Sequence, residues 1–174
     1  QEIKSGNAKI RIVEGFINDV KIQGDDAAND PIIRGYADKI RASKPLNVET
    51  LERYLLLMED LPGVEARAVL QASPNTPGAS DVIVNIKRKN IEGSAIADNR
   101  GSRFLGPEQL NLTVAFNNLL TQDDQTQFRL VGTPFDPDEL LFGEIRHEEQ
   151  LGSEGTKAVF SGSYIKTRPG HTLE

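Results

Sequence analysis

P-L-N-V-E-T-L-E-R-Y-L-L-L-M-E-D-L-P-G-V, residues 45–64, is the stretch from which the fold of this chain can be worked out. Asn47 is a good helix N-cap, because its side-chain oxygen can accept a hydrogen bond from a backbone amide of the first turn. Pro62 and Gly63 are typical of a helix end. The stretch therefore predicts one helix that begins after Asn47 and ends before Pro62.

The predicted helix carries an apolar stripe. Leu51, Leu55 and Met58 recur at helical spacing, and Tyr54 and Leu57 widen the stripe. A stripe of this kind normally packs into a hydrophobic core. We therefore expect Leu51, Leu55 and Met58 to lie on a sheet built by the flanking segments.

Two alternating runs precede the helix, at residues 8–14 and 16–23. Alternation of apolar and polar side chains is typical of β-strands. In the second run we expect Phe16, Val20 and Ile22 to share one face. The first run is separated from the second by Gly15.

A first helix is expected between these strands and the long helix. Asp30 followed by Pro31 forms an N-cap and a first helical residue, and the helix must end ahead of Pro45. Two further strands are expected at residues 65–72 and 81–89. The order is strand, helix, helix, strand, strand, and such a sheet buries one face under its helices.

The second half of the chain lacks a convincing helix. Short alternating runs, separated by polar turns, are expected to be strands at residues 110–119, 127–131, 139–146 and 157–167. Segments of this kind are typical of the wall of a β-barrel. An ordinary soluble sandwich produces the same alternation, so periodicity leaves both architectures open.

Composition excludes several classes of function. The formal net charge is −6 and no basic stripe stands out, which argues against a nucleic-acid partner. The chain contains no cysteine, so disulfides, thiol catalysis and thiolate metal sites are excluded. No run is long and apolar enough for a membrane-spanning helix. Because the chain starts at Gln1 rather than methionine, we expect a processed or trimmed start.

Few residues suggest an enzyme. His147 lies beside Glu144, Glu148 and Glu149, but the second histidine, His171, is distant and no metal-binding spacing accompanies either. No nucleophile motif surrounds the serines and threonines. We therefore expect no catalytic residues, no metal and no cofactor.

Three runs of the sequence resemble a known family. They are E-G-F-I-N-D-V-K-I-Q-G-D, then the helix of residues 45–64, then A-D-N-R-G-S-R-F-L-G-P-E-Q. In this order they resemble the outer-membrane transporters of two-partner secretion, of the haemolysin activation/secretion type. The resemblance implies two polypeptide-transport-associated (POTRA) domains, each strand-helix-helix-strand-strand, followed by a sixteen-stranded barrel.

The resemblance also implies a division of this α+β chain. Residues 1–14 correspond to the last strand of a preceding POTRA domain, residues 15–92 to a POTRA domain, and residues 93–174 to the first strands of a truncated barrel. We expect a fragment that does not form a pore alone. Because open strands leave edges that seek partners, we expect them to pair with another copy of the chain or to fold into a small closed sheet.

The function implied by the resemblance is transport of a polypeptide. The POTRA part, in the periplasm of a Gram-negative bacterium, captures an unfolded exoprotein of the haemolysin or adhesin class and passes it to the barrel in the outer membrane. The expected partners are this secreted exoprotein and outer-membrane lipid. The alternative is a soluble β-rich binding or adhesion module without a transport role.

An edge strand is the candidate binding site. An exposed strand edge pairs with an extended polypeptide through its backbone, with little regard for sequence. Ala66, Ala68 and Ala72 are small and are expected to leave a shallow groove beside the long helix. The residues proposed to bind are Glu65, Arg67, Val69 and Gln71. The alternative is an edge that Arg67 merely protects from aggregation.

Overall fold

The computed structural model describes residues 3–4, 7–8, 14–24 and 27–170. The chain packs as two units, one from residues 1–59 and 66–87 and the other from residues 60–65 and 88–174. Near the start, β1 (Ile3–Lys4) pairs with β2 (Asn7–Ala8). Most of the strand predicted at residues 8–14 lies outside the described residues.

The first helix forms where the sequence predicts it. It is α1 (Pro31–Ala42), preceded by the short 3₁₀ helix η1 (Ala27–Asn29). The buried carboxylate of Asp30 accepts hydrogen bonds from the amides of Ile32 and Ile33, at 2.8 and 3.0 Å. These bonds satisfy two amides that have no partner within the helix.

The long helix is α2 (Val48–Glu59). The side-chain oxygen of Asn47 accepts a hydrogen bond from the amide of Thr50 at 3.1 Å, as expected of an N-cap. The helix ends at Glu59, ahead of Pro62 and Gly63. Gly63 has a φ of +67°, a conformation that side chains disfavour, so glycine suits this turn.

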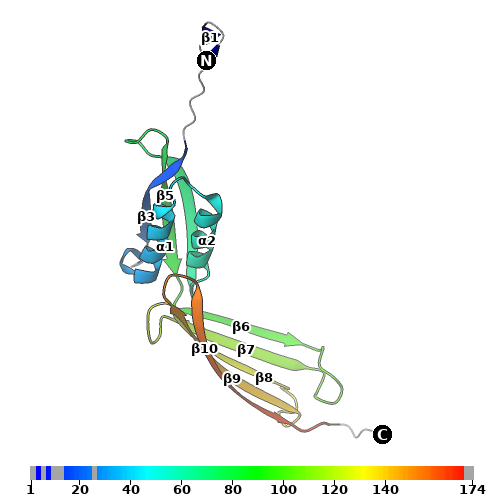
Figure 1. Ribbon diagram of the computed structural model, residues 1–174. Helices are drawn as coiled ribbons and strands as arrows, with labels where there is room; N and C mark the ends of the chain where they lie inside the picture. Colours follow the sequence, from blue (N-terminus) through cyan, green and yellow to red (C-terminus); the bar gives the residue numbers. More distant parts are fainter. Residues whose placement is uncertain (1–2, 5–6, 9–13, 25–26, 171–174) are drawn as a thin grey trace. The chain divides into compact units, whose positions relative to one another are not determined.

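The first unit contains a three-stranded sheet of β3 (Phe16–Gly24), β4 (Val64–Ala72) and β5 (Ala79–Arg88). The strand order is β3-β5-β4, and β3 runs parallel to β5. Both helices cover the same face of this sheet (Figure 1). The predicted order of strand, helix, helix, strand and strand is therefore observed.

The core of the first unit lies between the helices and the central strand. The side chains buried there come from β3, from both helices and from β5; they are Ile17, Ile33, Tyr36, Ile40, Met58, Val82, Val84 and Ile86. The rings of Tyr36 and Tyr54 join α1 to α2 at a centroid distance of 5.9 Å. Burial of this many apolar groups is the main term that holds the layer of helices on the sheet.

The prediction that Phe16 shares one face of β3 with Val20 and Ile22 is wrong for Phe16. The register between β3 and β5 shifts between Ile17 and Asp19, which places Asn18 in an irregularity of the β-bulge kind. A bulge adds one residue to a strand and so exchanges the faces on its two sides. Ile17, fully buried, therefore joins Val20 on the helix side, and Phe16 does not.

The second unit contains one five-stranded antiparallel sheet in the order β10-β9-β8-β7-β6. Its strands are β6 (Ile91–Asp98), β7 (Gln109–Asn117), β8 (Asp124–Gly132), β9 (Leu140–Leu151) and β10 (Thr156–Thr167). Four of them overlap the predicted strands, and β6 was not predicted. The strand order is open, so the expected small closed sheet is not observed, and the alternative of pairing with another copy of the chain stays a prediction.

The stripe of α2 is buried unevenly. Met58 is fully buried and Tyr54 nearly so, whereas Leu51 and Leu55 are only half-buried. Of the three residues expected to lie on the sheet, Met58 is therefore the one that is fully buried. The helix covers less of the sheet than its apolar stripe suggests.

We expect Met58→Ala to lower the free energy of unfolding of the first unit by about 2–5 kcal/mol, because it opens a cavity in a packed core. Leu55→Ala is the matched control and is expected to cost about 1 kcal/mol, because solvent already reaches that side chain. Urea denaturation followed by circular dichroism measures both. An equal loss for the two variants would contradict this description of the core.

Candidate functional site: an edge strand and a two-faced sheet

The four residues predicted to bind a polypeptide lie on β4, which is an edge strand of the first sheet. Glu65, Arg67, Val69 and Gln71 are all exposed, and the side chain of Val69 is 55% accessible. An exposed edge strand offers backbone N–H and C=O groups to an incoming strand. The geometry of β4 is compatible with this use.

Glu65 differs from the other three because its carboxylate is engaged. Lys89 forms an ion pair with it, and the hydrogen bond and then the charge of Glu65 raise the pKa of Lys89 above its ordinary value. Both side chains are about half accessible, so the pair is well solvated. Arg67, Val69 and Gln71 are therefore the better candidates for contacts with a partner.

The alanine face of β4 is more open than predicted. Ala66 is half-buried, but Ala68 and Ala72 are exposed, and Leu70 on the same face is 52% accessible. Small side chains on this strand leave apolar atoms in contact with solvent. Backbone pairing, rather than a deep groove, is what β4 offers.

The second sheet has two chemically different faces, as its register shows. Directly opposite residues of paired strands lie on the same face, and faces alternate along each strand. We call one of them the apolar face. Its apolar members include Ile91, Ala95, Ala97, Leu110, Leu112, Val114, Phe116, Phe128, Leu130, Leu141, Ile145, Phe160 and Tyr164. Its other positions include Gly93, Gly132, Gly143 and Gly162, and also the polar residues Asp124, Thr126, His147, Glu149 and Lys166.

The opposite face is mostly polar. Its members include Glu92, Ser94, Asn111, Thr113, Asn117, Gln125, Gln127, Arg129, Glu144, Arg146, Glu148, Gln150 and Lys157. A few apolar side chains, such as Val131, Leu140 and Phe142, interrupt it. The alternation predicted from the sequence is therefore present, and most charged side chains of the sheet lie on the polar face.

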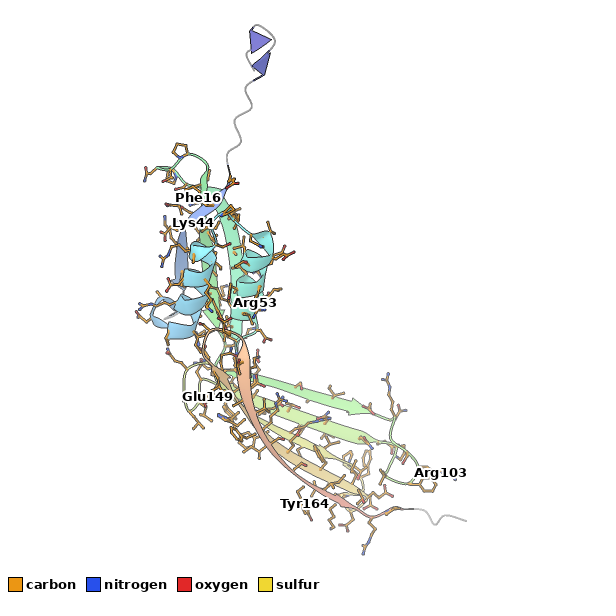
Figure 2. All side chains as sticks on the ribbon, viewed as in Figure 1. Phe16, Lys44, Arg53, Arg103, Glu149 and Tyr164 are labelled. Carbon is orange, nitrogen blue, oxygen red and sulfur yellow. The ribbon has the colours of Figure 1, made fainter. Side chains whose placement is uncertain are left out.

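In soluble proteins apolar side chains are usually buried and polar ones exposed, but several side chains of this sheet show the reverse. Phe128, Phe160 and Tyr164 of the apolar face are 45%, 68% and 65% accessible, whereas Asn117 and Gln150 of the polar face are 3% and 7% accessible. Figure 2 shows Tyr164 on the outermost strand, β10. Among the described residues of the second unit, all strands belong to one sheet, so no second sheet formed by these residues covers the apolar face. A contiguous exposed patch of this kind marks a surface that meets an apolar partner.

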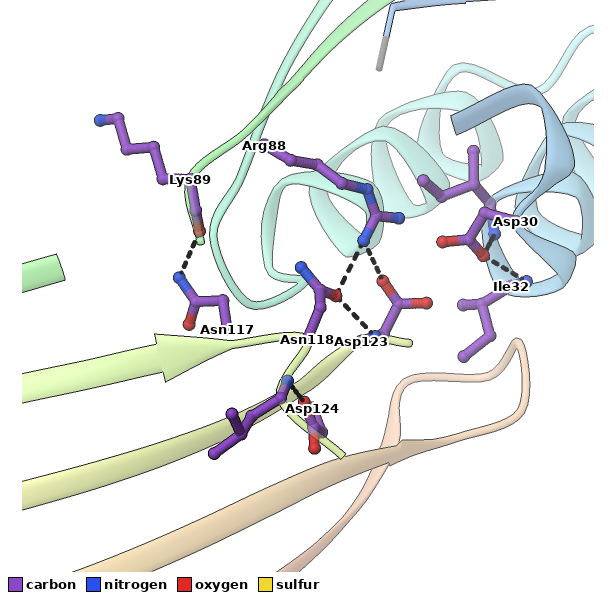
Figure 3. Close-up of polar contacts among 10 residues, drawn as sticks. Asp30, Ile32, Arg88, Lys89, Asn117, Asn118, Asp123 and Asp124 are labelled. Atoms are coloured by element: carbon purple, nitrogen blue, oxygen red, sulfur yellow. Dashed lines mark hydrogen bonds and ion pairs between the residues drawn. The ribbon is translucent and has the colours of Figure 1, made fainter. Parts of the chain in front are cut away.

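A buried ion pair orders the turn between β7 and β8 (Figure 3). The guanidinium of Arg88 lies 3.1 Å from the carboxylate of Asp123 and donates a hydrogen bond to the side-chain oxygen of Asn118 at 3.0 Å. The same oxygen of Asn118 accepts the amide of Asp123. Arg88 and Asp123 are 11% and 0% accessible, so the pair is shielded from solvent screening.

Asp124 completes the turn. Its carboxylate accepts hydrogen bonds from the amides of Leu119, Leu120 and Thr121, at 2.7, 2.8 and 3.1 Å. Three amides that would otherwise be desolvated are thereby satisfied by one buried charge. The conformation of the turn is consequently held by several hydrogen bonds to buried side chains.

Hydrogen bonds of Asn117 and Lys89 hold the segment that leads into β6. The side chain of Asn117 donates to the carbonyl of Lys89 at 2.7 Å and accepts from the side chain of Gln125 at 2.8 Å. The amide of Lys89 in turn donates to the carbonyl of Gly63 at 2.8 Å. A Cβ at Gly63 would lie 2.2 Å from the carbonyl oxygen of Lys89, so only glycine allows this approach.

His147 lies on the same face as Phe160, and its Nδ1 is 3.0 Å from the hydroxyl of Thr126. Among the described residues, no three His, Asp or Glu side chains gather as a metal site. In the same part of the chain, no helix has the length and apolar character needed to cross a membrane.

Comparison with known proteins supports the family resemblance. No model of a known protein family matches the chain. Curated relatives from strains of Haemophilus influenzae, named heme/hemopexin transporter protein HuxB, are 24% identical over 172 residues, which is 98% of this chain. The chain spans 30% of the length of these relatives. The resemblance to transporters of two-partner secretion is confirmed, and the relatives are transporters rather than enzymes, as predicted.

Solved structures resemble the chain in fold. CdiB from Acinetobacter baumannii aligns with 86% of this chain and 28% of its own, with a TM-score of 0.51 and 17% identity. BamA from Haemophilus ducreyi lacking POTRA domains 1–3 aligns with 91% of this chain and 28% of its own, with a TM-score of 0.49 and 16% identity. The likeness to CdiB indicates that the α+β arrangement of helices and two sheets is a shared fold.

We expect Arg88→Met to lower the free energy of unfolding by about 3–5 kcal/mol, because it leaves the Asp123 carboxylate buried without its cation. Adding Asp123→Asn is expected to recover part of the loss. Arg146→Met, which removes a partly exposed ion pair with Glu148, is the control and is expected to cost about 1 kcal/mol or less. Urea denaturation of the three variants tests this, and no recovery in the double variant would contradict it.

Proposed function

We propose that this chain is part of an outer-membrane transporter that captures a secreted polypeptide in extended form and passes it to a membrane barrel. The two-faced sheet carries the proposal. In a transmembrane barrel, apolar side chains face lipid and polar side chains face the lumen, with strict alternation along each strand. The exposed apolar face of the sheet and the largely covered polar face of β7–β9 match this pattern.

The proposal assigns the second sheet to the bilayer. Residues 93–174 would form the first strands of the barrel, with outer-membrane lipid against the apolar face. A soluble sandwich requires the apolar faces of two sheets to meet. The accessibility of Phe128, Phe160 and Tyr164 favours a lipid partner over that alternative.

The proposal assigns the first unit to the periplasm, as a POTRA domain of residues 15–92. The element order β3-α1-α2-β4-β5 and the two helices on one face support this assignment. A domain with two strand edges, β3 and β4, is suited to hold an unfolded client through its backbone. The client would be an exoprotein of the haemolysin or adhesin class, taken up along Arg67, Val69 and Gln71.

Outer-membrane insertion should depend on which face receives a charge. In the full-length protein, we expect Phe128→Arg to destabilise the inserted barrel by about 2–4 kcal/mol, because the side chain then meets hydrocarbon. Gln127→Arg, one residue earlier and on the polar face, is the matched control and should insert normally. The amount of folded protein in the outer-membrane fraction measures the difference, and equal insertion of both variants would exclude a lipid-facing role.

Client capture on β4 should depend on its backbone. In the full-length protein, we expect Val69→Pro to slow secretion of the partner, because proline removes a backbone donor and distorts the strand. Val69→Ala, which keeps the donor, is the control and should secrete at the normal rate. Pulse-labelled export of the partner measures both. Normal secretion by a correctly inserted Val69→Pro variant would show that β4 is not the capture edge.

A further inference from the structure

A groove lies between β3 and α1, on the side of the first unit away from β4. Its volume is about 320 Å³, and its lining residues are Val20, Ile22, Ala28, Arg34, Ala37, Asp38 and Arg41. Val20 and Ile22 come from β3 and are half-buried, while Ala37 of α1 is 7% accessible. The groove therefore has an apolar floor with charged residues of one helix along its rim.

The floor of the groove belongs to an edge strand. β3 pairs with β5 and forms the end of the strand order β3-β5-β4. A polypeptide added to this edge would run beside α1, with alternate side chains directed to the helix-covered side of the sheet. Those alternate side chains would meet Val20, Ile22 and the rim of α1.

The rim carries an excess positive charge. Arg34, Asp38 and Arg41 recur at helical spacing on one side of α1. Arg41 forms an ion pair with Asp38, which neutralises that part of the rim. Arg34 donates hydrogen bonds to the carbonyl of Ala28 at 2.5 Å and to the side-chain oxygen of Asn29 at 3.2 Å, and both acceptors are neutral. The charge of Arg34 is therefore not balanced by a carboxylate in these contacts.

We propose that the β3 edge and this groove bind an extended polypeptide segment in which apolar and acidic side chains alternate on one face. Backbone pairing along β3 supplies general affinity, the apolar side chains contact Val20 and Ile22, and an acidic side chain pairs with Arg34. The inference rests on the proposed function, since it names a second capture edge on the same unit. It differs from capture on β4, because the helix rim beside β3 selects for charge.

The test uses the 174-residue chain and a fluorescent peptide, V-T-D-T-V-T-D-T-V, whose valines and aspartates share one face of a strand. We expect this peptide to bind about tenfold more tightly than its V-T-K-T-V-T-K-T-V counterpart, as measured by fluorescence anisotropy at low salt. The double variant Arg34→Glu with Arg41→Glu should reverse the preference. Arg53→Glu, a charge reversal on α2 outside the groove, is the control and should leave the preference unchanged.

The position of the bound peptide is tested on the chain without charge-reversal substitutions. A photo-crosslinking residue in place of Ala28, at the groove, should capture the acidic peptide, and the same residue in place of Arg53, on α2, should not. Circular dichroism establishes that the charge variants are folded; if the double variant is not, Arg34→Gln alone should reduce the preference. Equal binding of the two peptides, no binding of either, or capture from position 53 but not from position 28 would overturn the inference.

A secretion assay separates this inference from the proposed function. If the full-length protein exports its partner but the acidic peptide is not crosslinked from position 28, the groove is not a capture site. The proposed transport function is then unaffected. If the full-length protein neither inserts into the outer membrane nor exports a partner, the proposed function fails. Binding at the groove would then describe a peptide-binding module without transport.

Discussion

The buried pair of Arg88 and Asp123 is the interaction on which the second unit depends. It joins the residue that ends β5 to the turn between β7 and β8, a separation of 35 residues in the sequence. Asn117 adds a parallel contact to the carbonyl of Lys89. Together they hold the start of β6 against the β7–β8 hairpin, so that the strands enter the sheet in a fixed register.

Register matters here because the two faces differ so strongly. A slip of one residue between paired strands moves every side chain of one strand to the opposite face. In this sheet, such a slip would place charges such as Arg129 and Glu144 on the face that now carries Phe128 and Ile145. A few buried polar contacts at one end of the strands thus protect the separation of apolar and polar surface along their whole length.

Much of the fold follows from local signals in the sequence. Asn47 and Asp30 cap their helices as predicted, and the strands expected at residues 16–23, 65–72 and 81–89 and in the second half are present, because caps and alternation act over a few residues. The strand β6 escaped detection, since I-E-G-S-A-I-A-D is rich in small residues and alternates weakly. The bulge at Asn18 and the half-burial of Leu51 and Leu55 depend on how neighbouring elements pack, which no local pattern reports.

The candidate sites were less predictable than the fold. The edge position of β4 could be proposed from the chain order of the elements, but the structure adds a second edge at β3, where Arg34 lies beside Val20 only because α1 packs on that strand. Each edge offers backbone groups that pair weakly and with little sequence preference, and that suits a client that must be released again. Charge on the α1 rim adds discrimination without deep burial, since exposed ion pairs contribute little affinity. If the proposed transport role holds, this combination of general pairing and modest selectivity suits the transient binding of an unfolded chain.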